Sequence, residues 1–222
     1  MVVTWTAVAG VAVIAFGLVV TPGPNMIYLV SRSVSQGRAA GLISLAGVAV
    51  GFLCYLLAAV LGISAVFLAV PALYTTVKLL GAAYLLWLAW TTLRPGGRSV
   101  FAVGELPVDR TRRLFLMGLM TNLLNPKIAV LYIALIPQFV DPGAGRVWLQ
   151  SLILGAVQIG VALSVNAVIV ILAGAIAAFL ANRPRWLRVQ RFAMGSVLGL
   201  LAVKLAVDDN VPAASPAGLR SA

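Results

Sequence analysis

Six apolar runs follow one another along the chain, with short polar stretches between them. Crossing the hydrocarbon core of a bilayer takes about 20 helical residues, and each run is long enough to do so. The pattern therefore predicts an all-α integral membrane protein with six transmembrane helices. The predicted spans are residues 5–30, 41–68, 71–93, 114–140, 148–180 and 186–207.

The basic residues between the runs predict how the helices are oriented. With six spans, the first, third and fifth connections share one side of the membrane and carry eleven arginines, whereas only Arg146 and Arg220 lie outside the spans on the other side. Loops rich in Lys and Arg stay in the cytoplasm, so we expect both termini to be periplasmic. The eleven are Arg32, Arg38, Arg94, Arg98, Arg110, Arg112, Arg113, Arg183, Arg185, Arg188 and Arg191.

A polar connection divides the six spans into two halves of three. It covers residues 94–113 and carries five arginines, so we predict a basic cytoplasmic linker that orients the helices and contacts anionic lipid. The two halves are then residues 1–93 and 114–207. Residues 208–222 are small and polar, and we expect them to form a disordered tail.

The composition excludes several kinds of chemistry. Apolar residues make up 62% of the 222 and charged residues 9%, and the mean hydropathy is +1.08, which is typical of a membrane protein. There is no histidine, Cys54 is the lone cysteine, and none of the five acidic residues lies deep inside an apolar run. We therefore predict no catalytic residue, no metal site, no cofactor and no enzyme. The net charge of +11 is not gathered in one stripe, which argues against nucleic acid as a partner.

Proline interrupts the first span of each half at a corresponding place. The first half reads TPGPNMIYLV and the second reads LLNPKIAVLY, so aligning Pro24 with Pro126 places Asn25 opposite Lys127. Because each half has an odd number of spans, the second half is inserted in the membrane in the opposite orientation to the first. Broken helices at matching positions of two inverted halves are the expected signature of an inverted-repeat transporter.

The two breaks are candidate binding sites for a carboxylate. Their prolines lack the N–H group that a helix needs, and Gly23 permits backbone angles that other residues avoid. Main-chain groups left unpaired at membrane depth must be satisfied by protein, water or substrate. A half-helix that starts at Asn25 or Lys127 would point free N–H groups and the positive end of its dipole at an anion. The alternative is a pair of proline kinks that serve packing only.

Lys127 is the most informative single residue, because a cation near the middle of a span costs several kcal/mol. We interpret Lys127 as a positive charge that helps to bind the substrate carboxylate. The alternative is a structural counter-charge to carbonyls at a helix C-terminus. Gln158 and Asn166 would bind polar groups of the substrate or join helices. The candidate substrate-binding residues are Thr21, Pro22, Gly23, Pro24, Asn25, Asn125, Pro126, Lys127, Gln158 and Asn166.

A second proline break, IPQFVD, lies at the outer end of the fourth span. We assign Gln138 and Asp141 there to proton coupling or gating, because Asp141 could pair with a substrate ammonium or carry a proton. The alternative for Asp141 is an exposed acidic residue at a helix end. The spacings Gly47-x3-Gly51 and Gly195-x3-Gly199 suit close helix contact, either inside one chain or across a homodimer.

Three stretches of the chain match a known family: TPGPNMIYLVSRSVSQGRAAGLISLAGVAVG at 21–51, LGAAYLLWLAW at 80–90 and GLMTNLLNPKIAVLYIALIPQF at 118–139. The first and third are specific, whereas the second is an ordinary apolar helix. Together they resemble the LysE/RhtB family of bacterial amino-acid exporters, over nearly the whole chain to about residue 208. The resemblance implies a small inner-membrane protein, often dimeric, that exports amino acids or derivatives with the proton motive force. The family's signature positions fall on Pro22, Gly23, Pro24, Asn25, Gly37, Gly41, Gly51, Asn125, Pro126, Lys127, Pro137 and Gln138.

Three other hypotheses about the function compete with an amino-acid exporter. A transporter of a different solute, such as a metal cation, is disfavoured because the spans lack acids and histidine. A membrane enzyme would need a Ser-Lys site, for example Ser44, Ser64 or Ser164 with Lys127, and no motif supports one. A structural or assembly subunit would have no use for paired broken helices. With no acid near the proposed site, a neutral substrate such as threonine, homoserine or leucine is favoured over lysine.

Overall fold

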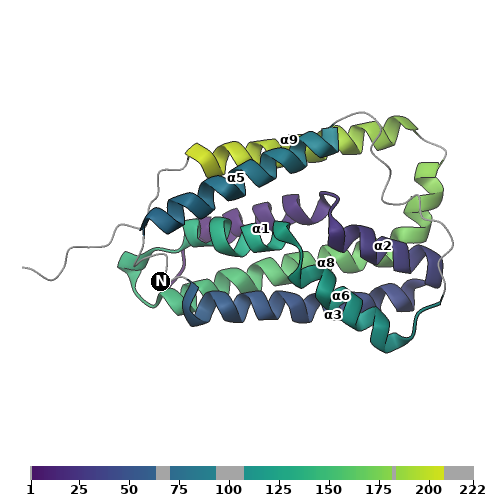
Figure 1. Cartoon of the computed structure of the whole chain (residues 1–222), viewed down its shortest axis with the longest axis horizontal. Coiled ribbons are helices and arrows are strands. Elements are labelled where there is room, and N and C mark those ends of the chain that lie inside the picture. The colour runs from purple at the N-terminus through teal and green to yellow at the C-terminus, as the bar shows by residue number, and fades with distance from the viewer. Residues whose placement is uncertain (1, 64–70, 94–107, 182–183, 208–222) are drawn as a thin grey trace, which may run out of the picture.

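The computed structural model describes residues 2–63, 71–93, 108–181 and 184–207, and within these residues it contains helices and no strand (Figure 1). The predicted tail 208–222, and the predicted linker apart from residues 108–113, lie outside the described residues. The elements are α1 (Trp5–Val20), α2 (Pro24–Gln36), α3 (Arg38–Ala58) with η1 (Ala59–Ile63), α5 (Pro71–Leu93), α6 (Thr111–Leu123), α7 (Pro126–Val130) with η2 (Leu131–Leu135) and η3 (Ile136–Phe139), η4 (Pro142–Ala144), α8 (Val147–Ala181) and α9 (Pro184–Val207).

All six predicted apolar runs are helical where the structure describes them, apart from the two breaks at residues 21–23 and 124–125 and the end of the fourth run at residue 140, so the prediction of an all-helical membrane protein is confirmed. Two described helices, Arg38–Leu61 and Val147–Ile176, are each long and apolar enough to cross a membrane. Two bent pairs qualify as further spans if each pair counts as one: α1 with α2, bent by 55°, and α6 with the helix from Pro126 to Phe139, bent by 49°. The chain is therefore a multi-pass membrane protein.

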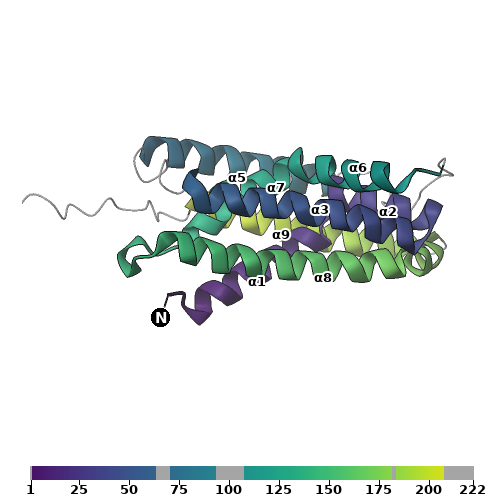
Figure 2. The same ribbon diagram turned by 90° about the horizontal axis from the view of Figure 1, so that it is seen from below.

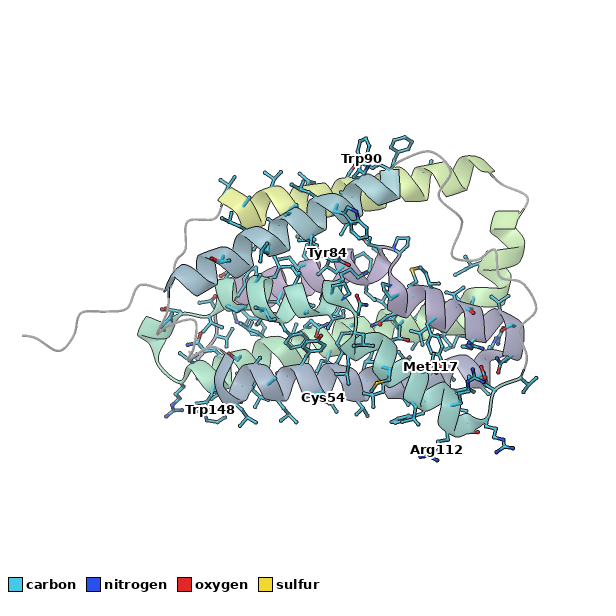
Figure 3. All side chains as sticks on the ribbon, in the orientation of Figure 1. Cys54, Tyr84, Trp90, Arg112, Met117 and Trp148 are labelled. Atoms are coloured by element: carbon cyan, nitrogen blue, oxygen red, sulfur yellow. The ribbon has the colours of Figure 1, made fainter. Side chains whose placement is uncertain are left out.

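The outer surface of the helices agrees with a lipid environment. Large apolar side chains are exposed along the described helices, and a water-soluble monomer rarely leaves so many uncovered. Trp5 and Trp148 are exposed, as are Trp87 and Trp90 on α5, and exposed tryptophans suit the membrane–water interface. Figure 3 shows Trp148 at the opposite end of the bundle from Arg112.

The two bent pairs run through the bundle in opposite directions. The N-terminus lies at one end of the bundle in Figure 1, and α1 and α2 lead from there toward the other end. That other end carries Arg112 at the start of α6, and α6 and α7 lead back (Figure 3). The second half-helix of each pair starts at proline, Pro24 or Pro126, one residue earlier than the expected Asn25 and Lys127. Proline is favoured at this first helical position because its missing N–H would have no partner there.

Close contact between α3 and α6, which lie side by side in Figures 1 and 2, depends on glycine. A Cβ atom on Gly47 would overlap the carbonyl of Phe115, and one on Gly118 would overlap the carbonyl of Ser44. Gly51 faces Asn122 in the same interface. The predicted Gly47-x3-Gly51 contact is thus made inside one chain, and Gly195 likewise packs on Leu93 of α5, whereas Gly199 has nothing within 4 Å.

A polar cluster joins α2 to the start of α6 at the end of the bundle that carries Arg112. The carboxylate of Asp109 accepts from the guanidinium groups of Arg32 and Arg113, the second at 3.1 Å. Gln36 completes the cluster, because its amide donates to that carboxylate at 3.3 Å and accepts from the Asp109 N–H at 2.9 Å. Arg32 also lies over the ring of Tyr28, 5.3 Å from its centroid.

Replacing Gly47, in the α3–α6 interface, by a larger residue should destabilise the protein. We expect Gly47→Val to lower the free energy of unfolding by about 1–3 kcal/mol or more, because the overlap is with backbone that cannot move aside easily. The measurement is the midpoint of thermal unfolding of the purified protein in detergent. The matched control is Gly160→Ala on α8, where nothing lies within 4 Å. An unchanged midpoint for Gly47→Val would contradict the described packing.

Candidate functional site

The first helix break leaves main-chain carbonyls of α1 without their helical partners. In a continuous helix the carbonyl of Leu18 would accept from the N–H group of residue 22, but Pro22 has none. The helix ends at Val20, and the chain passes through Thr21, Pro22 and Gly23 in an extended form before α2 begins. The hydroxyl of Thr21 donates to the carbonyl of Gly17 at 2.7 Å. The carbonyls of Leu18 and Thr21 remain available for another donor.

Lys127, from the second break, supplies that donor. Its Nζ atom donates to the carbonyl of Leu18 at 2.8 Å and to the carbonyl of Thr21 at 2.9 Å, and the residue is only 5% exposed. Gly23 makes room for the amine, since a Cβ atom there would lie 2.8 Å from Nζ. The observed contacts are those of the counter-charge arrangement, which the sequence left open beside a role in substrate binding.

The second break is held by its own asparagine. Asn125 caps α7, and its side-chain oxygen accepts from the N–H of Lys127 at 3.1 Å. This cap fixes the start of the half-helix and with it the direction in which the Lys127 side chain leaves the backbone. The first break has no equivalent cap, because Gly23 is the N-cap of α2 and no side chain bonds to the first turn. The first N–H groups of α2, at Asn25 and Met26, therefore have no capping side chain among the described residues.

A small cavity lies between the two breaks and α8. Its volume is about 20 Å³, which is room for about one water molecule. Four predicted site residues line it: Asn25, Lys127, Gln158 and Asn166. The remaining walls are apolar and come from Ala15, Leu18, Val19, Met26, Phe52, Ile128, Leu131 and Ala162.

Several amide groups around this cavity lack hydrogen-bond partners among the described residues. The side-chain oxygens of Asn25 and Asn166 are buried and unpaired, although the Asn166 nitrogen donates to the carbonyl of Ala162 at 2.8 Å. The Asn125 nitrogen is likewise unpaired. Buried polar groups in proteins are normally hydrogen-bonded, and each exception needs a water, an ion or a ligand to explain it. The unpaired amides make this cavity the candidate site for a polar ligand.

Tyr132 is a residue of the site that the sequence analysis missed. Its hydroxyl donates to the side-chain oxygen of Gln158 at 2.6 Å, and its ring stacks on that of Tyr55 at 5.5 Å between centroids. Tyr55 in turn donates to the carbonyl of Leu123 at the end of α6. This chain of contacts fixes the orientation of the Gln158 amide. A tyrosine inside an apolar run is so common that its position in the sequence gave no signal.

The structure does not bring Gln138 and Asp141 to the cavity. The Gln138 side chain donates to the carbonyl of Ala134 in its own helix at 2.9 Å. Asp141 is exposed and caps η4 by accepting from the N–H of Gly143 at 2.9 Å. The Asp141 contact is that of an exposed helix end, the alternative that the sequence left open, whereas Gln138 is partly buried. The coupling or gating role of both residues stays a prediction.

Electrostatically, the cavity contains one cation and no anion. Lys127 is the charged residue among those that line it, and the acidic residues that the structure describes, Asp109 and Asp141, lie elsewhere. Within the described part of the chain, no three Asp, Glu or Cys side chains gather closely enough to hold a metal ion. The described lining therefore combines one positive charge, neutral amides and apolar walls.

Comparison with known proteins shows which sequences the chain is similar to. A family described as LysE type translocator matches residues 5–209 of the chain. A leucine efflux protein of Enterobacter sp. (strain 638) is 31% identical over 154 residues, which cover 68% of this chain and 69% of that protein. An uncharacterized membrane protein of Pseudomonas aeruginosa is 32% identical over 160 residues, covering 69% of this chain and 71% of the relative. No solved structure matches the chain at a significant level.

The contact between Gly23 and Lys127 can be tested by a double-mutant cycle. We expect Gly23→Ala to lower the free energy of unfolding by about 1–3 kcal/mol, because the added methyl group displaces the amine and leaves two buried carbonyls unpaired. In protein that already carries Lys127→Met, the same change should cost much less. Thermal unfolding of the two single variants and the double variant measures the coupling. Additive effects would show that the two residues do not interact as described.

Proposed function

The chain belongs to the LysE type translocator family, and on that premise we propose that it is a secondary transporter that exports neutral amino acids or close derivatives across the bacterial inner membrane. The observation that carries the proposal is the cavity at the two helix breaks, where unpaired amides, a buried cation and apolar walls meet. The transporter uses the proton motive force and alternating access, and it performs no enzymatic reaction.

The substrate carboxylate binds at the first turn of α2. The N–H groups of Asn25 and Met26 begin a helix that no side chain caps, and the positive end of a helix dipole favours an anion. The side-chain amides of Asn25, Gln158 and Asn166 line the same cavity and supply further hydrogen bonds. Thr21, Pro22, Gly23 and Pro24 form the first break, and Asn125 and Pro126 form the second.

The apolar walls select the side chain of the substrate. Phe52, Met26 and Ala162 lie in the lining and would contact an aliphatic group, and no acidic residue is present there to bind a second ammonium. A neutral aliphatic amino acid such as leucine fits this chemistry better than lysine does, and threonine and homoserine remain candidates. The relatives named leucine efflux proteins, at about 30% identity, support the same choice.

Transport requires the cavity to enlarge, because an amino acid needs several times the room of one water molecule. We propose six spans arranged as two inverted halves, residues 1–93 and 114–207, with α5 and α9 as the third and sixth. The opposite directions of the two bent pairs support this arrangement (Figure 1). Rocking of one half against the other opens the site alternately, and the Asp109 cluster between α2 and α6 closes it on the cytoplasmic side. Both termini are periplasmic, residues 94–113 form the linker, and two copies form a dimer.

The competing functions fit the site less well. A metal-cation exporter would be expected to offer anionic ligands such as carboxylates or thiolates, whereas the described lining of the cavity offers neutral amides and a cation. An enzyme of the Ser-Lys type would need a serine beside Lys127, but the acceptors of its amine are main-chain carbonyls. The hypothesis of a structural subunit does not explain why amides around an internal cavity are left unpaired.

Uptake into everted membrane vesicles tests the proposal. Export from the cell becomes uptake in this orientation, so vesicles that contain the protein should accumulate one or a few labelled neutral amino acids when a proton gradient is imposed. Vesicles from cells with the empty vector provide the control, and a panel of all common amino acids identifies the substrate. Failure to accumulate any of them, with the protein shown to be inserted, would contradict the proposal.

Filling the cavity should reduce transport of large substrates most strongly. We expect Ala162→Phe to lower the rate of leucine uptake by about tenfold to a hundredfold, because the ring occupies the space that the substrate needs. Uptake of a smaller transported amino acid should fall less. The matched control is Ala156→Phe, which adds the same ring on an exposed position of α8. Equal uptake by the two variants would argue that the substrate binds elsewhere.

A further inference from the structure

The amine of Lys127 is held by an unusual set of partners for a buried cation. Its two acceptors are the main-chain carbonyls of Leu18 and Thr21 at the C-terminal end of α1, and no carboxylate is present in the lining of the cavity. The C-terminal end of a helix carries a partial negative charge, so these carbonyls form a site for a cation. Lys127 occupies that site in this structure.

An α-ammonium group is the same chemical group as the end of a lysine side chain. Each carries one positive charge and three N–H donors and accepts no hydrogen bond. The carbonyls of Leu18 and Thr21 therefore suit the ammonium group of an amino acid as well as they suit Lys127. The first turn of α2, at the same break, suits the carboxylate of that amino acid. One helix break thus offers partners for both charged groups of a zwitterion.

We propose that Lys127 carries the proton that drives transport, and that its amine and the substrate ammonium occupy the carbonyls of Leu18 and Thr21 in turn. This inference rests on the proposed function. Two ammonium groups cannot share one buried pair of carbonyls, because like charges repel and an unpaired buried charge is costly. When the substrate ammonium takes the carbonyls, the Lys127 ammonium releases its proton to the cytoplasm and becomes a neutral amine.

The cycle balances in protons and charge. After the site opens to the periplasm and the substrate leaves, the neutral amine of Lys127 takes a proton there and returns to the carbonyls. One proton thus enters the cell for each zwitterion that leaves, with no change to the substrate. A lysine amine can exchange its proton in this way, whereas a guanidinium keeps its own. The described structure, with a cavity too small for an amino acid, corresponds to the substrate-free, protonated state.

No other titratable group competes for this role within the lining that the structure describes. The lining residues of α1, α2, α3, η2 and α8 are apolar residues or neutral amides. The hydroxyls of Tyr132, Tyr55 and Tyr28 donate to Gln158, Leu123 and Leu114, respectively. Asp109 is paired with Arg32 and Arg113, and Asp141 is an exposed cap of η4.

The first test measures substrate binding to the purified wild-type protein in detergent. Calorimetric titration with leucine, in buffers of different ionisation enthalpy, should show release of about one proton per leucine bound. By linkage, the affinity for leucine should rise by up to about tenfold per pH unit over the range in which Lys127 is protonated in the free protein. Binding of leucine without proton release, and with an affinity independent of pH, would overturn the proposal.

The second test separates proton movement from substrate movement in proteoliposomes. A pH-sensitive dye inside the liposomes reports protons, and exchange of labelled for unlabelled leucine reports transport without a gradient. For Lys127→Met we expect proton movement during net leucine flux to be lost, and the leucine exchange that remains to be independent of pH. For Lys127→Arg we expect both to fall at least about tenfold, because the guanidinium keeps its proton and stays on the carbonyls. The matched control, Arg112→Met, removes an exposed cation from α6 and should behave as wild type.

The outcomes distinguish the two proposals. Proton-coupled accumulation of leucine by Lys127→Met would overturn the assignment of Lys127 and leave the export function standing. Net leucine flux through the wild type, driven by a leucine gradient, with no accompanying proton movement would do the same. Absence of transport by the wild type across the whole amino-acid panel would instead contradict the proposed function. If Lys127→Met does not fold, the binding test on the wild type decides the question.

Discussion

Main-chain groups that proline leaves unpaired at membrane depth are the constraint from which the rest of this structure follows. The hydrocarbon core offers no water, so each such group must find a partner inside the protein. Pro22 removes the donor for the carbonyl of Leu18, the chain then leaves the helix, and the carbonyls of Leu18 and Thr21 are paired instead by the amine of Lys127. A helix break that would be unstable alone is thereby stabilised by the other break.

This pairing makes one site out of two distant segments. The amine of the second broken helix caps the C-terminal end of the first, and Asn125 fixes the backbone from which that amine extends. The uncapped first turn of α2, the unpaired oxygens of Asn25 and Asn166, and the Gln158 amide held by Tyr132 face the same small cavity. In the proposed mechanism, a substrate that binds there changes the partners of both breaks, and this change couples binding to the movement of one half of the protein relative to the other.

The sequence predicted the helices and the depth of the polar residues, but it could not predict which residues contact one another across helices. Hydrophobic runs and proline fix where helices lie and break, so the helical segments, both breaks and four cavity residues were foreseen. The contact between Lys127 and the end of α1 joins residues more than 100 positions apart, and no periodicity reports on such a contact. Spacing also could not show that Gln138 and Asp141 turn to local partners, or that Tyr132 orients Gln158.

In the proposed cycle, a transported amino acid takes over the carbonyls that Lys127 occupies in the substrate-free protein. The decisive measurement is a structure of the protein with bound leucine, at a resolution that shows the orientation of the ligand. We expect the leucine ammonium within hydrogen-bonding distance of the carbonyls of Leu18 and Thr21, its carboxylate at the N–H groups of Asn25 and Met26, and the Lys127 amine displaced. Leucine bound elsewhere, with the Lys127 amine still on both carbonyls, would show that the two amines do not exchange places.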